Sequence, residues 1–239
     1  MKKLIIIPTY NECENVGRMI DTLMSLDGGF DVLIVDDGSP DGTAGIVRDL
    51  QTKYAGRLVL VERRGKLGLG TAYMEGFHYA LKSGYDYIFE MDCDFSHNPD
   101  DLMPMCNVLD GGADVVVGSR YVTGVNVVNW PLSRLLMSYF ASKYVRMVTG
   151  MPVNDATAGF VGYKRAVLEA IDLDNVKMTG YGFQIEMKYT AWRLGFTICE
   201  MSIIFVDRIA GTSKMSGGIF GEAFFGVLKL PFRRFARRA

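Results

Sequence analysis

Cysteine and histidine are scarce in this 239-residue chain, which has four of the former and two of the latter. The cysteines are dispersed, and no two have the spacing of metal ligands: Cys13, Cys93, Cys106 and Cys199. The sequence therefore argues against a zinc site, and it is typical of a reduced, cytoplasmic protein. A signal-peptide pattern is also missing, as is any run of 18 uncharged apolar residues, so no transmembrane helix is predicted.

Two common nucleotide-binding motifs are absent as well. A dinucleotide-binding domain carries Gly-x-Gly-x-x-Gly after its first strand, whereas this chain has Pro8-Thr9-Tyr10-Asn11-Glu12 there. No Gly-x-x-x-x-Gly-Lys-Ser/Thr stretch exists, which excludes a P-loop. A glycine-rich loop over residues 63–70 is compatible with a phosphate cradle or with simple turn geometry, and the sequence leaves both open.

Charge is nearly balanced overall but unevenly distributed. Five basic residues and no acid occupy residues 229–239, which leaves 21 basic against 27 acidic residues in the body. The body therefore carries about −6 and the tail +5. A basic tail on an acidic body is typical of proteins that bind an anionic surface, either lipid headgroups or nucleic acid.

Apolar runs alternate with helical patterns along the first half of the chain. Strands are predicted over 3–7, 30–35, 58–62, 87–91 and 113–117, and helices over 14–25, 43–54, 70–83 and 100–109. This alternation predicts an α/β domain with a mostly parallel sheet flanked by helices. The second half is less regular, with helices expected over 131–149 and 183–194 and strands over 159–163 and 196–206. No linker separates the halves, so one domain is expected.

Polar clusters follow three of the predicted strands: Pro8–Glu12, Asp36–Asp37 and Asp92–Asp94. The carboxyl ends of parallel strands share one sheet edge, where open α/β sheets bind ligands. Two aspartates one residue apart project to the same side at strand spacing, and a divalent cation with oxygen ligands would offset their repulsion. The alternative is a solvated turn, because aspartate is common where strands end.

At these clusters the sequence resembles the inverting, metal-dependent glycosyltransferases with the A-type fold, and within them the polyprenol- or dolichyl-phosphate mannose synthases. The matching segments span nearly the whole chain in the family's order: 8–12, 35–43, 66–73, 91–99, 118–121, 130–134, 159–160, 183–187, 205–208 and 211–214. Cys93 departs from the alanine that the family often has between its aspartates.

The resemblance implies a set of site residues. The guanosine pocket would comprise Pro8, Tyr10, Glu12, Val35 and Asp37. The ribose, the diphosphate and Mg2+ or Mn2+ would lie at Asp92, Cys93 and Asp94, with Ser96 as a further metal neighbour. Phosphate groups would contact Arg120, Arg208 and Lys214, and Gln184 and Glu186 would lie near the sugar unless they have core or capping roles. The implied catalytic set is Asp92, Asp94, Arg120, Arg208 and Gln184.

The acceptor side can also be argued from residue spacing. Arg134 and Ser138 are four apart on the predicted helix 131–149 and therefore share a face. Together with Arg120 that face would hold a lipid phosphate, because arginine matches phosphate oxygens in forked geometry. The alternative is a solvated helix face. The two histidines are not needed for such chemistry, and His97 is expected to be structural.

Two segments have the composition of interfacial helices. The helix 131–149 mixes apolar and basic residues, and residues 219–239 place Phe220, Phe224, Leu228, Phe232 and Phe235 near one row beside the basic cluster. The alternative is a packed C-terminal helix with a frayed basic end. We expect a catalytic domain over 1–215, with a nucleotide-sugar half to about 120 and an acceptor half from 121, and a membrane-associating helix over 216–239. Removing residues 229–239 is expected to release the protein from membranes without unfolding it.

The resemblance implies an enzyme that transfers mannose from GDP-mannose to a polyprenyl monophosphate with inversion and releases GDP, and the two interfacial segments predict peripheral attachment to the cytoplasmic face of a membrane. A membrane-anchoring partner subunit is left open. The alternatives are transfer of glucose from UDP-glucose to the same kind of acceptor, or a non-catalytic subunit that binds nucleotide sugars. A nucleic-acid partner would explain the basic tail but not the acidic strand ends, so none is expected.

Overall fold

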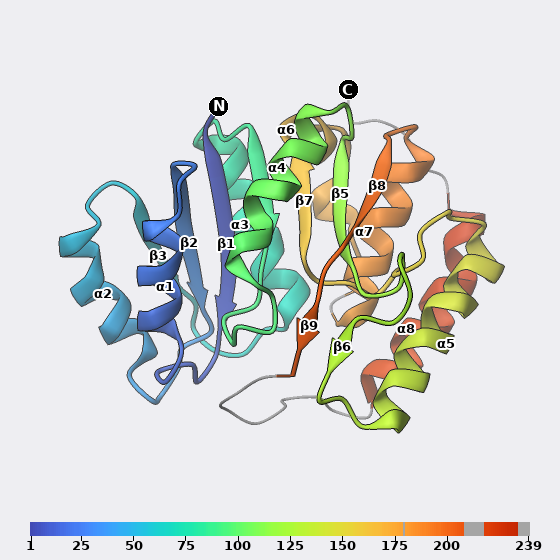
Figure 1. Ribbon diagram of the computed structural model, residues 1–239, viewed down its shortest axis with the longest axis horizontal. Helices are drawn as coiled ribbons and strands as arrows, with labels where there is room; N and C mark the ends of the chain where they lie inside the picture. The colour runs from blue at the N-terminus through green and yellow to red at the C-terminus, as the bar shows by residue number, and fades with distance from the viewer. Residues whose placement is uncertain (179, 208–217, 234–239) are drawn as a thin grey trace.

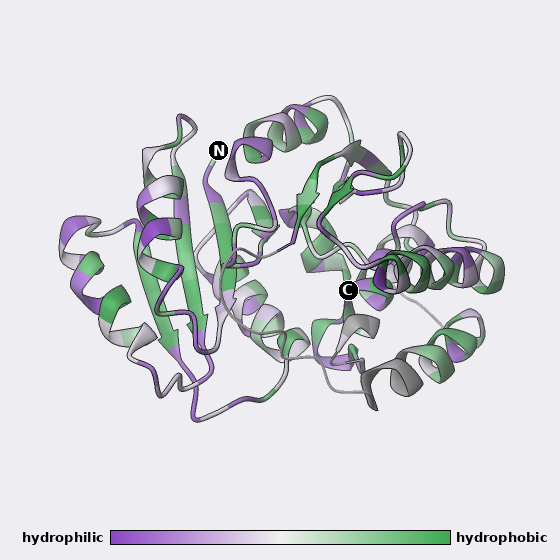
Figure 2. Cartoon of the chain, turned by 60° about the horizontal axis from the view of Figure 1, so that its bottom comes forward, coloured by the Kyte–Doolittle hydropathy of each residue, from purple (hydrophilic) through white to green (hydrophobic). Residues whose placement is uncertain are grey.

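A seven-stranded sheet in the order β3-β2-β1-β4-β7-β5-β8 runs through the molecule (Figure 1). The computed structural model describes residues 1–178, 180–207 and 218–233. The strands of this sheet are β1 Lys3–Thr9, β2 Phe30–Asp36, β3 Leu58–Glu62, β4 Tyr87–Glu90, β5 Val115–Ser119, β7 Val161–Lys164 and β8 Ile198–Ser202. They are mostly hydrophobic (Figure 2), as expected for strands covered on both faces.

The strand pairing brings the polar clusters to one edge. β1 pairs in parallel with β2 and β4, and its register places Thr9 opposite Asp36 and Ile6 opposite Glu90. β7 alone runs antiparallel, between β4 and β5, so β5 has the same direction as β4. The segments that follow β1, β2, β4 and β5 therefore meet at the carboxyl edge of the sheet.

Helices cover both faces of the sheet (Figure 1). Along β1 the side chains alternate: Ile5 and Ile7 pack beneath α1 and α4, whereas Leu4 and Ile6 pack against α3, α6 and α7. The helices are α1 Val16–Ser25, α2 Thr43–Lys53, α3 Leu69–Lys82, α4 Leu102–Asp110, α5 Leu132–Thr149, α6 Arg165–Ala170, α7 Tyr181–Arg193 and α8 Gly218–Lys229.

The predicted elements are confirmed to within two residues at each end, except for the C-terminal helix and one strand. The helix expected over 216–239 ends at Lys229, and Leu230–Phe232 form a 3-10 turn after it. The strand expected over 196–206 is two strands, because β8 ends at Ser202 and the chain leaves the main sheet. The next residues form β9 Phe205–Val206, which pairs in parallel with β6 Val127–Val128 in a separate two-stranded sheet. This small sheet was not predicted, since two-residue strands leave no periodic signal.

The C-terminal helix α8 lies alongside α5 and packs against α7 (Figure 1). Val227 and Leu230 are fully buried with Val145 of α5 and Tyr189 of α7. Arg233 forms an ion pair with Glu186 of α7, which is itself 1% exposed. These contacts argue against the expectation that residues 229–239 can be removed without unfolding, because removal would uncover the site of Leu230 and leave the buried Glu186 carboxylate without its cation.

Candidate active site

The two aspartates that follow β4 occupy a turn. β4 ends at Glu90, so Asp92 and Asp94 are not within a strand, and Phe95 adopts a left-handed conformation with φ of 60°. Asp94 is buried and accepts a hydrogen bond from the backbone N–H of Ser96 (3.1 Å), whereas Asp92 is half-buried. The hydroxyl of Ser96 is buried and has no hydrogen-bond partner among the described residues. The turn thus offers oxygen atoms only, the ligand type that Mg2+ and Mn2+ accept.

His97 stabilises this turn, which agrees with the structural role expected for it. Its Nδ1 accepts a hydrogen bond from the backbone N–H of Asp92 (3.1 Å), and its ring stacks on Phe160 at 4.9 Å. Burial lowers the pKa of His97 to about 4, so the imidazole is neutral near pH 7. Cys93, between the two acids, is 4% exposed and belongs to the hydrophobic core.

The residues after β1 lie beside those after β2. Tyr10 is half-buried with the ammonium of Lys66 over its ring at 5.3 Å, and Glu12 accepts a hydrogen bond from Asn15 (2.9 Å) at the start of α1. Pro8 is within β1 and partly exposed. Val35, by contrast, is fully buried in the core on the α3 side, so its side chain lies behind this surface and offers no area to a ligand.

Asp37 is held by an arginine that the sequence analysis did not single out. Arg63 follows β3, and its Nε donates to Asp37 (2.6 Å). The same guanidinium donates to the hydroxyl of Thr71 (2.8 Å) and to the carbonyl of Gly68 (3.3 Å). Arg63 and Asp37 are both buried, so the pair is shielded from solvent. Arg63 therefore joins the end of β2 to the glycine-rich loop and the first turn of α3.

Arg120 directly follows β5 and is bound by a second buried acid. Its Nε and terminal nitrogen donate to both carboxylate oxygens of Asp155 (2.7 and 2.6 Å), and its backbone N–H donates there as well (2.9 Å). Asp155 has no exposed surface and Arg120 is 8% exposed. The guanidinium also donates to the hydroxyl of Thr157 (3.0 Å). Arg120 is thus fixed in place by the loop 155–157.

An indole ring brings the two predicted acceptor arginines together. The guanidinium carbons of Arg120 and Arg134 lie 5.2 and 4.2 Å from the ring centroid of Trp130. Arg134 also pairs with Asp207 (2.8 Å), and both side chains retain about a quarter of their exposure, at 29% and 27%. Ser138, one turn along α5, accepts a hydrogen bond from the hydroxyl of Tyr121 (2.9 Å). Trp130 carries a buried N–H with no partner among the described residues.

Comparison with known proteins identifies the family. The model of the family "Glycosyl transferase family 2" matches residues 4–172, more than half of the chain. The chain belongs to this family. Two curated relatives agree: the polyprenol monophosphomannose synthase of Mycolicibacterium smegmatis is 43% identical over 97% of this chain and 88% of its own length. The undecaprenyl-phosphate mannosyltransferase of Micrococcus luteus is 44% identical over 96% of this chain and 93% of its own.

Solved structures support the fold. A crystal structure of glucosyl-3-phosphoglycerate synthase from Mycobacterium tuberculosis with UDP superimposes with a TM-score of 0.66, at 18% identity, over 97% of this chain and 79% of that one. A complex of the same enzyme with Mn2+, UDP and its product gives 0.67 at 17% identity, over 96% and 78%. The expected α/β glycosyltransferase fold of the A type is confirmed.

Two further residues expected near the sugar of this glycosyltransferase lie inside the protein. Gln184 is 2% exposed; its amide donates to Glu90 (2.6 Å) and accepts from Lys188 (3.3 Å). Glu186 accepts from the backbone N–H groups of Lys177 (3.1 Å) and Met178 (2.9 Å), besides pairing with Arg233. The capping and core roles considered for both residues therefore match their contacts.

Some predicted residues cannot be placed. Arg208 and Lys214, expected at phosphates, lie outside the described residues, as do Arg234, Phe235, Arg237 and Arg238 of the basic tail. Within residues 1–178, 180–207 and 218–233, no three Asp, Glu, His or Cys side chains gather closely enough to hold a metal by themselves. A cation at Asp92 and Asp94 would thus need Ser96, water or the oxygens of a ligand to complete its coordination.

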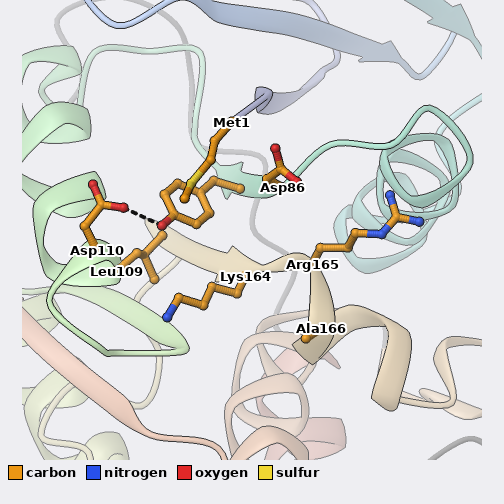
Figure 3. Close-up of a pocket in the computed structure, with 8 residues that line it drawn as sticks. Met1, Asp86, Leu109, Asp110, Lys164, Arg165 and Ala166 are labelled. Atoms are coloured by element: carbon orange, nitrogen blue, oxygen red, sulfur yellow. Dashed lines mark hydrogen bonds between the residues drawn. The ribbon is translucent and has the colours of Figure 1, made fainter.

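A hollow lies at the opposite, amino-terminal edge of the sheet (Figure 3). It is lined by the start of β4, the end of α4 and the β7–α6 junction. Its charged groups already have protein partners: Tyr87 donates to Asp110 (2.5 Å), and Arg165 pairs with Glu169 (2.6 Å). The acids and arginines described above lie instead at the carboxyl edge of the sheet.

Sequence reasoning missed three members of this site: Arg63, Asp155 and Trp130. Trp130 stands inside the matching segment 130–134, so its position carried a usable signal, whereas Asp155 lies four residues before 159–160 and outside every matching segment. Arg63 had only its place at a strand end, as the first residue of the glycine-rich loop 63–70. The partnerships themselves join residues 26 and 35 positions apart, which local patterns do not report.

Proposed function

We propose that this chain transfers mannose from GDP-mannose to a polyprenyl monophosphate, with inversion at the sugar, and releases GDP. The observation that carries the proposal is the 43–44% identity, over nearly the entire chain, to two proteins named for mannose transfer to polyprenyl or undecaprenyl phosphate. The geometry supports it, because acids suited to a metal follow β4 and Arg120 follows β5 at the same edge of the sheet, with Arg134 of α5 next to Arg120 across Trp130.

The donor would lie along the ends of β1, β2 and β4. Tyr10 offers a ring and Glu12 and Asp37 offer acceptor oxygens for the base and ribose. Asp92, Asp94 and Ser96 would hold Mg2+ or Mn2+, and the buried, unpartnered Ser96 hydroxyl fits that role. When bound, such a cation offsets the charge of the departing diphosphate.

The acceptor phosphate would lie by Arg120, Arg134 and Ser138. The guanidinium groups of Arg120 and Arg134 flank Trp130, each paired with an aspartate, and the indole N–H of Trp130, which has no partner among the described residues, is a further donor for an anion. The second pKa of a phosphate monoester is about 6, so the acceptor is largely a dianion at neutral pH and needs no general base. Its oxygen forms a bond to C1 of mannose as the bond from C1 to the diphosphate breaks.

This function is tested with purified protein, a panel of nucleotide sugars, a short polyprenyl phosphate and Mg2+ or Mn2+. We expect metal-dependent transfer with GDP-mannose and release of one GDP per sugar transferred. Preference for UDP-glucose would overturn the assignment of the sugar. Nucleotide-sugar binding without turnover would indicate a non-catalytic subunit instead.

We further propose that α5 and α8 rest on the cytoplasmic face of a membrane. Large apolar side chains are exposed on these helices and just after them: Phe140 of α5 is 62% exposed, Phe225 of α8 is 63% exposed, and Phe232, in the 3-10 turn that follows α8, is 88% exposed. Phe224 and Leu228 are also exposed, as the predicted row requires, whereas the side chains of Phe220 and Phe235 lie outside the described set. Lys143 of α5 and Lys229 of α8 add positive charge beside the apolar surface. Among the described residues, none of the helices combines the length and apolar character that a bilayer span needs.

Charged substitutions on this surface should weaken vesicle binding. Phe140→Glu/Phe225→Glu is expected to reduce co-sedimentation with phosphatidylglycerol-containing vesicles at least tenfold, because burial of two aromatic rings is lost and anionic lipid repels the new carboxylates. Met103→Glu, an exposed apolar position on α4, is the matched control and should sediment like the wild type. Equal sedimentation of all three proteins would contradict the membrane assignment, and a membrane-anchoring protein would then be the alternative.

A further inference from the structure

A chain of buried polar groups connects the donor side of the site to its acceptor side. It begins at Glu90 in β4, two residues before Asp92. The carboxylate of Glu90 accepts a hydrogen bond from the amide of Gln184 (2.6 Å). The amide oxygen of Gln184 accepts from the ammonium of Lys188 (3.3 Å), one turn along α7. The ammonium then donates to the backbone carbonyl of Ala158 (2.7 Å).

The far end of this chain is next to the loop that fixes Arg120. Ala158 directly follows Thr157, and both Thr157 and Asp155 bind the Arg120 guanidinium. The backbone N–H of Ala158 also donates to the carbonyl of Asp155 (3.3 Å), which closes the loop. A displacement of the Ala158 carbonyl would therefore move the groups that orient Arg120.

Burial makes this arrangement costly. Glu90 and Lys188 have no exposed surface, and Gln184 has 2%. Removing an ammonium and a carboxylate from water costs several kcal/mol for each ion, and an apolar side chain of similar size often stabilises a fold better. Burial raises the pKa of Glu90 and lowers the pKa of Lys188, whereas the opposite charge of each favours the ionised form of the other. A role beyond fold stability would explain why α7 carries a lysine here, behind the sheet (Figure 1).

We infer that Lys188 is a positioning residue for sugar transfer: through Gln184 and Ala158 it sets the placement of the Asp155–Thr157 loop, and hence of Arg120, relative to the aspartate turn after β4. The inference rests on the proposed function for its reaction, but not for its geometry. Lys188 itself is fully buried, so it would act through these groups and not by direct contact with a substrate.

Three variants separate this role from a general contribution to stability. Lys188→Met keeps the length of the side chain and removes the charge and the donor. Lys188→Met/Glu90→Gln also removes the carboxylate left unpaired, which should restore thermal stability because no uncompensated ion remains. Met187→Ala, at a fully buried apolar neighbour in α7, is the matched control that loses stability without touching the polar chain.

The kinetic readout is kcat/KM for the acceptor, measured at a temperature where every variant is folded. We expect Lys188→Met to lower it by at least about tenfold, as observed when a supporting partner of a site is removed. The double variant should recover stability but not kcat/KM, and Met187→Ala should keep kcat/KM near the wild-type value. Wild-type kcat/KM in Lys188→Met, or recovery of kcat/KM together with stability in the double variant, would overturn the inference.

A second readout does not depend on turnover. In a Trp192→Phe background, Trp130 is the only tryptophan, and its ring lies 5.2 Å from the Arg120 guanidinium. Its fluorescence emission should change in Lys188→Met and in the double variant, but not in Met187→Ala. If the wild type transfers no sugar, the proposed function fails, and this emission still decides the role of Lys188: an unchanged spectrum in Lys188→Met overturns it.

Discussion

Replacing Asp94 by alanine is expected to abolish measurable sugar transfer, with a loss of roughly 10²–10³-fold or more, the range found when one preorganised charge-stabilising group is removed from an active site. Asp94 is buried in the turn after β4, where its carboxylate also accepts the backbone N–H of Ser96. Its removal takes away both a metal ligand and the hydrogen bond that shapes the turn. Turnover with Mn2+ and GDP-mannose measures the first effect.

Asp94→Asn provides the control for the second effect, because an amide oxygen still accepts the Ser96 N–H while the charge is lost. We expect Asp94→Asn to fold like the wild type, to bind Mn2+ more weakly and to remain severely impaired. Normal turnover by Asp94→Ala, or full wild-type activity after exhaustive chelation of divalent ions, would show that the aspartate turn is not the metal site.

Replacing Arg120 by methionine should damage both stability and acceptor use. Asp155 is fully buried, and removing its bidentate partner leaves a carboxylate without compensation, a change that typically costs about 3–5 kcal/mol. Chemical denaturation gives the loss in the free energy of unfolding, and acceptor titration gives the rise in KM.

Arg134→Ala is the informative comparison for Arg120. Arg134 also faces Trp130, but its ion pair with Asp207 is partly exposed, so the free energy of unfolding should change by at most about 1 kcal/mol. The KM for the acceptor should nevertheless rise, with little change in the KM for GDP-mannose. An unchanged acceptor KM in both variants would remove the arginines from the acceptor site.

Most of the sheet could be predicted from the sequence because strands such as β1, β2 and β5 are mostly apolar and buried. Residues 58–62, for example, are a strand in both the prediction and the structure. The sequence predicts one strand over 196–206 because hydrophobic residues continue through Ile203 and Ile204. The break after Ser202 depends instead on pairing, since Ile203 hydrogen-bonds to Ser119 of β5 whereas β9 pairs with β6. Local pattern does not encode which partner a strand finds.

Charged and polar residues were harder to assign. Such a residue gives the same sequence pattern whether its side chain contacts a ligand or pairs with another residue inside the protein. Arg233 was counted with the membrane-binding basic tail, yet the structure pairs it with buried Glu186. Gln184 was placed near the sugar, yet both ends of its amide bind Glu90 and Lys188. Only the fold distinguishes the two uses, since the partners are far apart in the chain.

Helix α5 carries Arg134 and Ser138 beside Trp130 and Tyr121, while Leu136 and Phe140 of the same helix are exposed to the surroundings. A lipid substrate that reached Arg134 and Arg120 along α5 would keep its isoprenoid chain in the acyl layer of the membrane throughout turnover. Its encounter with the enzyme would then be a search in two dimensions, governed by how densely the lipid is packed in the leaflet rather than by its amount in the surrounding volume.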